Sequence, residues 1–247
     1  MSGAKNGKTN KLRMILIIVV VLLLGIVITG VFIFRDIDKY KYRFYGKMTA
    51  DLKDSDLYSD MQSGKSFCFL GDSITLGAAS DMVPWYYHIE KNITGDVSSY
   101  CNNGWTSKTL KNNVEEIPVA DVYVVAIGIN DVVFVKEELG ALTSEEYVEI
   151  LQEMTESIKS RAPEAKFYFV APWPFLGQSE EVEELRDVYA TELDKWCSEQ
   201  DVTFIEPADI ITAAWDKDSP DKYMVDYLHP NERNGIGLYS YAVLKEA

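Results

Sequence analysis

The chain has 247 residues, of which 47% are hydrophobic and 26% charged, and its formal net charge is −15. This length predicts one large domain or two small ones, and the composition excludes a wholly disordered or collagen-like chain. Residues 1–47 hold nine Lys/Arg and two Asp, whereas residues 48–247 hold 15 Lys/Arg and 37 Asp/Glu. Because so acidic a body repels phosphate backbones, we expect no nucleic-acid partner.

Residues 14–34 form an uncharged run of 21 residues, made almost entirely of Ile, Val, Leu and Phe. As a helix this run spans about 31 Å, which matches the apolar thickness of a bilayer. A buried core helix and a cleaved signal peptide are the alternatives. Core helices rarely lack polar residues on every face, and a secretory apolar segment is shorter and ends at a small-residue cleavage site. The run therefore predicts a single transmembrane helix that anchors the chain in the lipid bilayer.

Basic residues lie on both sides of this run, so the count of positive charges does not decide the orientation in the membrane. We expect residues 1–13 to be a cytoplasmic tail and the C-terminal part to lie outside the cell. Residues 35–64 show no sustained apolar period and predict a solvated linker. Residues 65–247 then form the only domain.

Three cysteines are too few for a disulfide scaffold. Cys68 and Cys101 lie in strand-like runs and Cys197 in a helical one, so we expect all three to be small buried apolar residues. A bridge between Cys68 and Cys101 stays open if their two strands are neighbours.

Short apolar runs alternate with helical patterns throughout the C-terminal part. A capping box begins one helix at Thr143, with Glu146 three residues later, and a second apolar stripe extends from Val182 to Trp196. This alternation predicts an α/β domain of three layers, α/β/α, with a five-stranded parallel sheet covered on both faces. Ligands bind such sheets beyond the carboxyl ends of the strands. The five predicted strands are residues 66–70, 97–101, 122–127, 166–171 and 202–205.

Ser73 comes directly after the first predicted strand, in the sequence Gly-Asp-Ser-Ile-Thr. A serine at a strand-to-helix turn has its hydroxyl at the open edge of the sheet, close to backbone N–H groups of the helix start. This arrangement is typical of an activated nucleophile with part of an oxyanion site, although Gly-Asp-Ser is also a common turn and cap sequence. The chain has no Gly-x-Ser-x-Gly sequence, which argues against the α/β-hydrolase family.

The second and third predicted strands are also followed by residues with possible roles. Gly104 either gives its loop conformational freedom or lets its N–H approach a substrate oxygen. Asn130, in Gly-Ile-Asn-Asp, either ends the strand in a turn or donates its side-chain amide to the same oxyanion.

Asp226 and His229 stand three residues apart near the C-terminus, and a helical turn would place them on one face. The carboxylate can then hold Nδ1–H while Nε2 removes a proton from a serine. The other histidine, His88, has no acidic residue at such a spacing and is interpreted as part of an aromatic helix face. No cluster of His, Cys and Glu has metal-ligand spacing, and no Gly-rich loop fits a phosphate.

Together, Gly-Asp-Ser-Ile-Thr, the glycine of the second block, Gly-Ile-Asn-Asp and Asp-x-x-His-Pro resemble the SGNH (GDSL) hydrolase family, in the order found there. The resemblance extends over about residues 65–245. It is specific as a set, whereas each block alone is a weak signal. It implies a flavodoxin-like fold and an enzyme that cleaves esters without a metal or an organic cofactor.

The resemblance also implies a role for each of these residues. Ser73 would be the nucleophile, His229 the general base and Asp226 the residue that orients the histidine. The backbone N–H groups of Ser73 and Gly104 and the side chain of Asn130 would form the oxyanion hole.

Trp105, Trp173 and Phe175 lie just beyond strand ends, in loops that would surround the cleft. Aromatic faces there fit sugar rings, and structural packing is the alternative. The predicted membrane anchor and the family resemblance together imply a serine esterase on the cell surface that deacylates O-acetylated cell-envelope carbohydrate.

Two other functions remain open. One is an O-acyltransferase that passes the acyl group to a surface glycan, with a membrane acyl-donor protein as its partner. The other is a non-catalytic module that binds the cell wall.

Overall fold

The computed structural model describes residues 14, 17–23, 25, 41–133, 142–177, 179–200 and 202–247. The chain divides into two compact units, Met1–Tyr42 and Arg43–Ala247. Among the described residues, no helix combines the length and the apolar character needed to cross a membrane. Most of the predicted transmembrane segment 14–34 lies outside the described residues, as does the tail 1–13.

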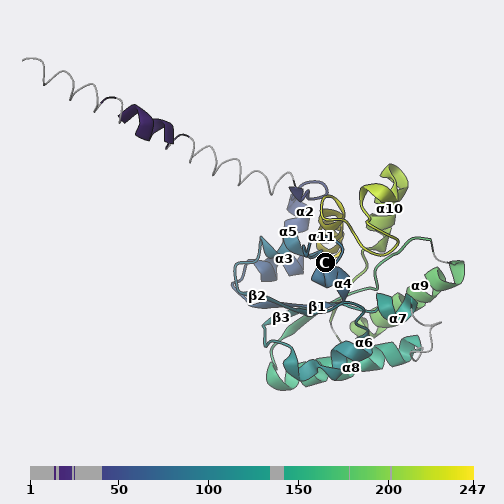
Figure 1. Cartoon of the computed structure of the whole chain (residues 1–247). Helices are drawn as coiled ribbons and strands as arrows, with labels where there is room; N and C mark the ends of the chain where they lie inside the picture. The colour runs from purple at the N-terminus through teal and green to yellow at the C-terminus, as the bar shows by residue number, and fades with distance from the viewer. Residues whose placement is uncertain are drawn as a thin grey trace, which may run out of the picture. The chain divides into compact units, whose positions relative to one another are not determined.

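A parallel sheet of five strands runs through the second unit, in the order β2-β1-β3-β4-β5 (Figure 1). This order is the flavodoxin-like one, and it confirms the five-stranded parallel sheet predicted from the sequence. Gly71 at the end of β1 pairs with Cys101 of β2 and Ala126 of β3, so these three strands end at one edge. The strands are β1 (Phe67–Gly71), β2 (Val97–Cys101), β3 (Val122–Ala126), β4 (Lys166–Val170) and β5 (Thr203–Ile205).

Helices cover both faces of the sheet (Figure 1). One face carries α2 (Ala50–Lys53), α3 (Asp56–Met61), α5 (Tyr87–Glu90), α10 (Ala208–Asp218) and α11 (Gly235–Glu246). The other face carries α6 (Ser107–Asn112), α8 (Ser144–Arg161) and α9 (Glu180–Glu199). The short helices α4 (Ser73–Leu76) and α7 (Ile129–Val133) follow β1 and β3. The segments η1 (Val114–Glu116) and η3 (Pro220–Lys222) are 3₁₀ turns.

The capping box predicted from the sequence is present at the start of the long helix α8. The Thr143 hydroxyl accepts from the backbone N–H of Glu146 at 3.2 Å, and the Glu146 carboxylate accepts from the Thr143 N–H at 2.8 Å. This capping box begins α8, which ends before Pro163. All five residues of β1 and of β3 are buried, as near-continuous apolar strands between two helical layers must be.

The prediction of a solvated linker over residues 35–64 was wrong for its C-terminal part, because residues 43–64 belong to the compact unit. Leu52, Leu57 and Met61 of the helices α2 and α3 are fully buried in the core. These helices have only four and six residues, so neither contains enough turns to show an apolar period in the sequence.

The segment 43–48 is hydrogen-bonded to the N-terminal end of α11. The Arg43 N–H donates to the carbonyl of Arg233 at 2.8 Å, and the Tyr45 N–H donates to the carbonyl of Gly237 at 3.3 Å. A Cβ atom at Gly237 would lie 1.7 Å from the Arg43 carbonyl oxygen. Only glycine therefore allows this segment to lie so close to the helix.

Asp72 occupies the turn between β1 and α4 and is completely buried. Its Oδ1 caps α4 by accepting from the Ile74 N–H at 2.9 Å, whereas its Oδ2 has no hydrogen-bond partner among the described residues. Burial raises the pKa of Asp72 to about 7; the Ile74 N–H opposes this, and the nearby Asp131 carboxylate adds to it. The turn before Ser73 thus contains a carboxyl group that keeps its proton at pH values well above those at which an aspartate normally loses it.

All three cysteines are free. Cys68 and Cys101 do lie on the paired strands β1 and β2, but Cys68 stands opposite Ser98 in the register. Burial raises the pKa of the Cys68 thiol to about 11, so this thiol stays protonated at neutral pH.

Gly237→Ala should destabilise the unit Arg43–Ala247 by about 1–3 kcal/mol, because the added methyl group displaces segment 43–48. Urea denaturation of both forms measures the difference. In a chain that starts at residue 49 the same substitution should cost little, since Arg43 is then absent. An equal cost in both chains would contradict the close contact.

Asp72→Asn should flatten the dependence of stability on pH. Between pH 4 and 7 the folded chain holds a proton on Asp72 that the unfolded chain releases, so stability falls by up to about 1.4 kcal/mol per pH unit from this group. The contribution is present below pH 4 and is lost as the pH rises through 7.

Urea denaturation of wild type and Asp72→Asn across pH 4.5–8 measures this slope, and Asn keeps an oxygen for the Ile74 N–H. Parallel stability profiles of the two proteins would contradict a protonated Asp72 in the fold.

Candidate active site

Ser73 is the first residue of α4 and is separated from the end of β1 only by Asp72. The strand turns tightly there: a Cβ atom at Gly71 would lie 2.1 Å from Thr75 Oγ1 and 2.5 Å from the Ala126 carbonyl oxygen. Glycine is therefore required at this position. The turn leaves Ser73 only 7% exposed, at the edge where β1, β2 and β3 end.

The structure brings Ser73 and His229 together across 156 residues of sequence. Ser73 Oγ lies 2.9 Å from His229 Nε2. On the other side of the ring, Nδ1 lies 2.9 Å from Oδ2 and 3.1 Å from Oδ1 of Asp226. A carboxylate at Nδ1 favours the tautomer with its proton on Nδ1, which leaves Nε2 free to accept from the serine hydroxyl.

Asp226 is held as an ion by the loop that contains it. Its Oδ1 accepts from the backbone N–H groups of His229 at 2.7 Å and Leu228 at 2.8 Å. Partial burial alone would raise the pKa of Asp226, but these N–H groups and the His229 ring outweigh it, and the pKa is lowered. The carboxylate is therefore charged at neutral pH and would stabilise the positive charge that forms on the imidazole when Nε2 takes up a proton.

The loop between η3 and α11 is fixed by further bonds. The Val225 N–H donates to the His229 carbonyl at 2.8 Å, and the Asn231 N–H donates to the Tyr223 carbonyl at 2.7 Å. Asn231 Oδ1 in turn accepts from the N–H of Gly235 at the start of α11 at 3.1 Å. These contacts fix the position of His229 in a loop. The helical turn that the three-residue spacing predicted for Asp226 and His229 is therefore not present.

Gly104 lies on the loop after β2 and Asn130 in the short helix α7, and the two segments contact each other. Asn130 is 2% exposed, and its Nδ2 donates to the carbonyl of Trp105 at 2.9 Å. One amide hydrogen of Asn130 remains for another acceptor. Gly104 has a φ of +68°, and a Cβ atom there would meet nothing within 4 Å. The backbone at Gly104 is thus open to an incoming group.

A buried pair that was not singled out from the sequence strengthens this contact. Asp131 accepts from the Ser107 hydroxyl at 2.6 Å and from the Ser107 N–H at 3.0 Å. Burial raises the pKa of Asp131, and the two Ser107 donors oppose this increase. The pair joins the start of α6 to α7 and so holds the Gly104 loop beside Asn130. Its signal was the carboxylate directly after Asn130.

The aromatic residues expected at the cleft are placed differently. Trp173 is 1% exposed and packs between Trp85, at 5.2 Å, and Tyr239, at 4.7 Å between ring centroids. The prediction that Trp173 binds substrate was therefore wrong: it is a core residue. Trp105 is half-buried against Tyr100, with ring centroids 5.1 Å apart.

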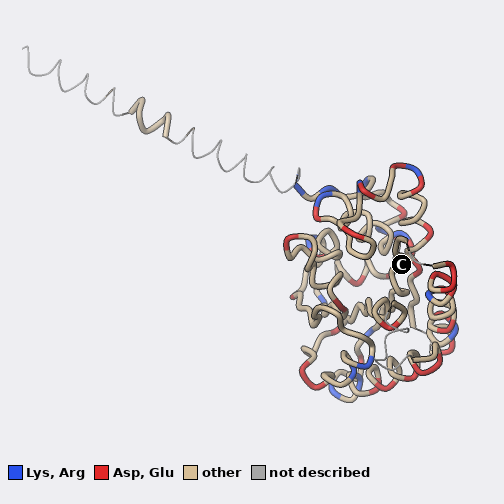
Figure 2. The backbone as a smooth tube through the Cα atoms, turned by 45° about the vertical axis from the view of Figure 1, so that its right-hand side comes forward, with Lys and Arg blue, Asp and Glu red and all other residues tan. Residues whose placement is uncertain are grey.

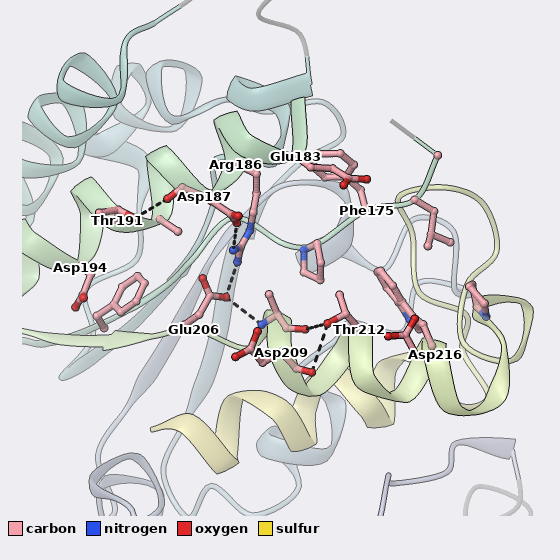
Figure 3. A pocket seen from close by; sticks show the side chains of 18 residues that line it. Phe175, Glu183, Arg186, Asp187, Thr191, Asp194, Glu206, Asp209, Thr212 and Asp216 are labelled. Carbon is pink, nitrogen blue, oxygen red and sulfur yellow. Dashed lines mark hydrogen bonds and ion pairs between the residues drawn. The ribbon is translucent and has the colours of Figure 1, made fainter. Parts of the chain in front are cut away.

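Phe175 is buried and lines a separate cavity between α9 and α10 (Figure 3). Tyr227, which the sequence analysis did not single out, follows Asp226 on the same loop and is 47% exposed. His88 is partly buried against Phe44, and burial lowers its pKa to about 4.

In the part of the chain that the structure describes, no group of three or more His, Cys, Asp or Glu could hold a metal ion.

Solved structures of other proteins share this fold at low identity. A GDSL-like lipase candidate from Parabacteroides merdae aligns with a TM-score of 0.66 and 16% identity, over 75% of this chain and 96% of its own. Axe2, an acetylxylan esterase from Geobacillus stearothermophilus, aligns with a TM-score of 0.62 and 19% identity, over 76% and 95%. A member of the lipolytic protein G-D-S-L family from Veillonella parvula gives 0.60 and 18%, over 73% and 96%.

No curated protein matches the sequence. The model of the GDSL-like Lipase/Acylhydrolase family matches residues 69–233, a range that includes Ser73, Gly104, Asn130 and His229. Since this match covers more than half of the chain, the protein belongs to the GDSL-like lipase/acylhydrolase family.

Proposed function

We propose that the chain is a serine esterase in which Ser73 attacks the carbonyl carbon of an acyl ester. The observation that carries the proposal is the 2.9 Å approach of Ser73 Oγ to His229 Nε2, with Asp226 at the opposite ring nitrogen. A serine hydroxyl becomes a useful nucleophile only where a base can take its proton, and this geometry supplies the base.

Acylation begins as Ser73 Oγ bonds to the carbonyl carbon and its proton passes to His229 Nε2. The bond to the leaving alkoxide then breaks, and His229 returns the proton to that oxygen. In deacylation, His229 takes a proton from water as the water oxygen attacks the acyl-serine. The carboxylic acid leaves and Ser73 regains its hydrogen.

Negative charge develops on the carbonyl oxygen during both attacks. The Ser73 N–H at the start of α4, the N–H of the exposed Gly104 and the remaining amide hydrogen of Asn130 are the donors that would stabilise it. Asn130 and the Asp131–Ser107 pair hold the Gly104 loop in place before substrate arrives. Such fixed donors need no reorganisation at the moment of reaction.

For the substrate, we propose an O-acetylated carbohydrate of the cell envelope. Axe2 is an acetylxylan esterase, and its catalytic mutants replace a serine, an aspartate and a histidine, with the aspartate three positions before the histidine. The same three residue types meet here, and Asp226 also precedes His229 by three positions. The apolar segment 14–34 would anchor the enzyme as a single-pass membrane protein with its catalytic unit outside the cell.

Ser73→Ala should lower the kcat for p-nitrophenyl acetate by at least about a thousandfold, because no nucleophile remains beside His229. Ser160→Ala, on the exposed side of α8, removes a hydroxyl of the same kind and should leave the rate unchanged. Hydrolysis by Ser73→Ala at the wild-type rate would refute the esterase mechanism.

Asn130→Ala should lower kcat by about 10²–10³-fold and change KM much less, since the lost donor acts on charge that appears in the transition state. Asn113→Ala is the matched control, because among the described residues the Asn113 side-chain amide donates to the Thr109 carbonyl of α6 and to no other group. Steady-state kinetics on p-nitrophenyl acetate measure both. A loss confined to KM would contradict the role given to Asn130.

A further inference from the structure

A cavity of about 720 Å³ lies between α9 and α10, beside the edge strand β5 (Figure 3). This volume is within the range of small-ligand sites in proteins. Ser73, Asp226 and His229 are not among its lining residues. The cavity is therefore separate from the catalytic hydroxyl and has no role in the mechanism derived above.

Two rows of carboxylates form opposite walls of this cavity (Figure 3). On α9, Glu183, Asp187 and Asp194 share one face, because their spacings of four and seven residues follow the helical period. On α10, Asp209 and Asp216 are seven residues apart and face them across the cavity.

One cation lines the cavity, and it is already paired. Arg186 is buried; its guanidinium donates to Asp187 at 3.0 Å, to Glu206 and to the Pro172 carbonyl at 2.7 Å. Among the described residues, no ion pair involves the carboxylates of Glu183, Asp194, Asp209 or Asp216. The excess negative charge attracts a cation and repels an anion. Figure 2 marks the positions of Asp and Glu along the backbone in red and those of Lys and Arg in blue.

Aromatic side chains form the rest of the wall. Phe175, Phe204 and Trp215 line the cavity together with the carboxylates. Trp215 is 4% exposed, and its indole N–H is shielded and has no hydrogen-bond partner among the described residues. A buried donor of this kind needs an oxygen atom from a water or a ligand. Aromatic residues, an unsatisfied donor and several carboxylates thus lie together around the cavity.

One wall of the cavity is hydrogen-bonded to the loop that contains His229. The Leu176 N–H, in the cavity wall, donates to the carbonyl of Tyr227 at 2.8 Å. Tyr227 directly follows Asp226 and has an exposed ring. A polymer bound in the cavity would therefore lie beside the loop that positions His229.

We propose that this cavity binds an amino-sugar unit of a glycan, with its amine free and protonated. The carboxylates would accept from the ammonium group and the hydroxyls, and the aromatic faces would pack against the sugar ring. The inference rests on the proposed esterase function in one respect: the glycan that loses its acyl group at Ser73 would carry this amino sugar further along its chain.

The test measures binding to the full chain in a non-ionic detergent by isothermal titration calorimetry at low salt. The probes are the β-1,4-linked trisaccharide of glucosamine and its fully N-acetylated counterpart, in which the positive charges are absent. We expect the glucosamine trisaccharide to bind at least about tenfold more tightly, and its affinity to fall as salt screens the carboxylates.

Asp209→Asn/Asp216→Asn should weaken binding of the glucosamine trisaccharide by at least about threefold, since two exposed ion pairs are lost. Glu149→Gln/Glu164→Gln removes the same charge from exposed positions of α8 and the loop after it, and should leave the affinity unchanged. Equal affinity for both trisaccharides, equal losses in the two double variants, or equally tight binding of trilysine would each overturn the proposal.

Hydrolysis of p-nitrophenyl acetate by the same preparations separates the two proposals. This small ester needs only Ser73, His229 and the oxyanion donors, so its turnover should be the same in both double variants. Turnover without amino-sugar binding would refute the cavity assignment alone. Amino-sugar binding without turnover would refute the esterase assignment and the link to substrate.

Discussion

The contact between Ser73 Oγ and His229 Nε2 is the interaction on which the functional account depends. It joins residues 156 positions apart, so it requires the parallel sheet to place the end of β1 beside the loop that precedes α11. The equal register of β1, β2 and β3 puts the first three blocks of the motif at one edge. The fourth block reaches the same edge through its own loop, after the last strand.

Each side of this contact is held by several independent bonds. On the serine side, Gly71 allows the tight turn and Asp72 caps the short helix that begins at Ser73. On the histidine side, Asp226 bonds both the ring and the backbone N–H of His229. Because the side chains are fixed before substrate binds, little reorganisation remains for the chemical step. The buried Asp72 carboxyl, next to Ser73, is a part of this arrangement that carries an electrostatic cost at high pH.

Much of the fold could be predicted from local signals, because strands covered on both faces are continuously apolar and α8 has a capping box. The candidate site followed from one topological rule: Ser73, Gly104 and Asn130 each come just after a predicted strand. Trp173 obeys the same rule and is buried all the same, since Trp85 and Tyr239 cover it in the folded chain. A position beyond a strand end therefore does not by itself show that a side chain faces the cleft.

Other features depended on contacts that no local pattern contains. Residues 43–64 join the domain through two short helices and through the approach of segment 43–48 to Gly237, which needs a partner far along the chain. The carboxylate rows of α9 and α10 were present as helical spacings. Only the packing of these two helices shows that the rows face each other across a cavity.

The most direct measurement of the central claim is covalent labelling of the full chain with a fluorophosphonate, read by peptide mass spectrometry. The account predicts a single adduct on Ser73, formed in the wild type and slowed by orders of magnitude in His229→Ala. An adduct on another residue, or labelling of Ser73 that is as fast without the imidazole, would contradict a serine activated by His229.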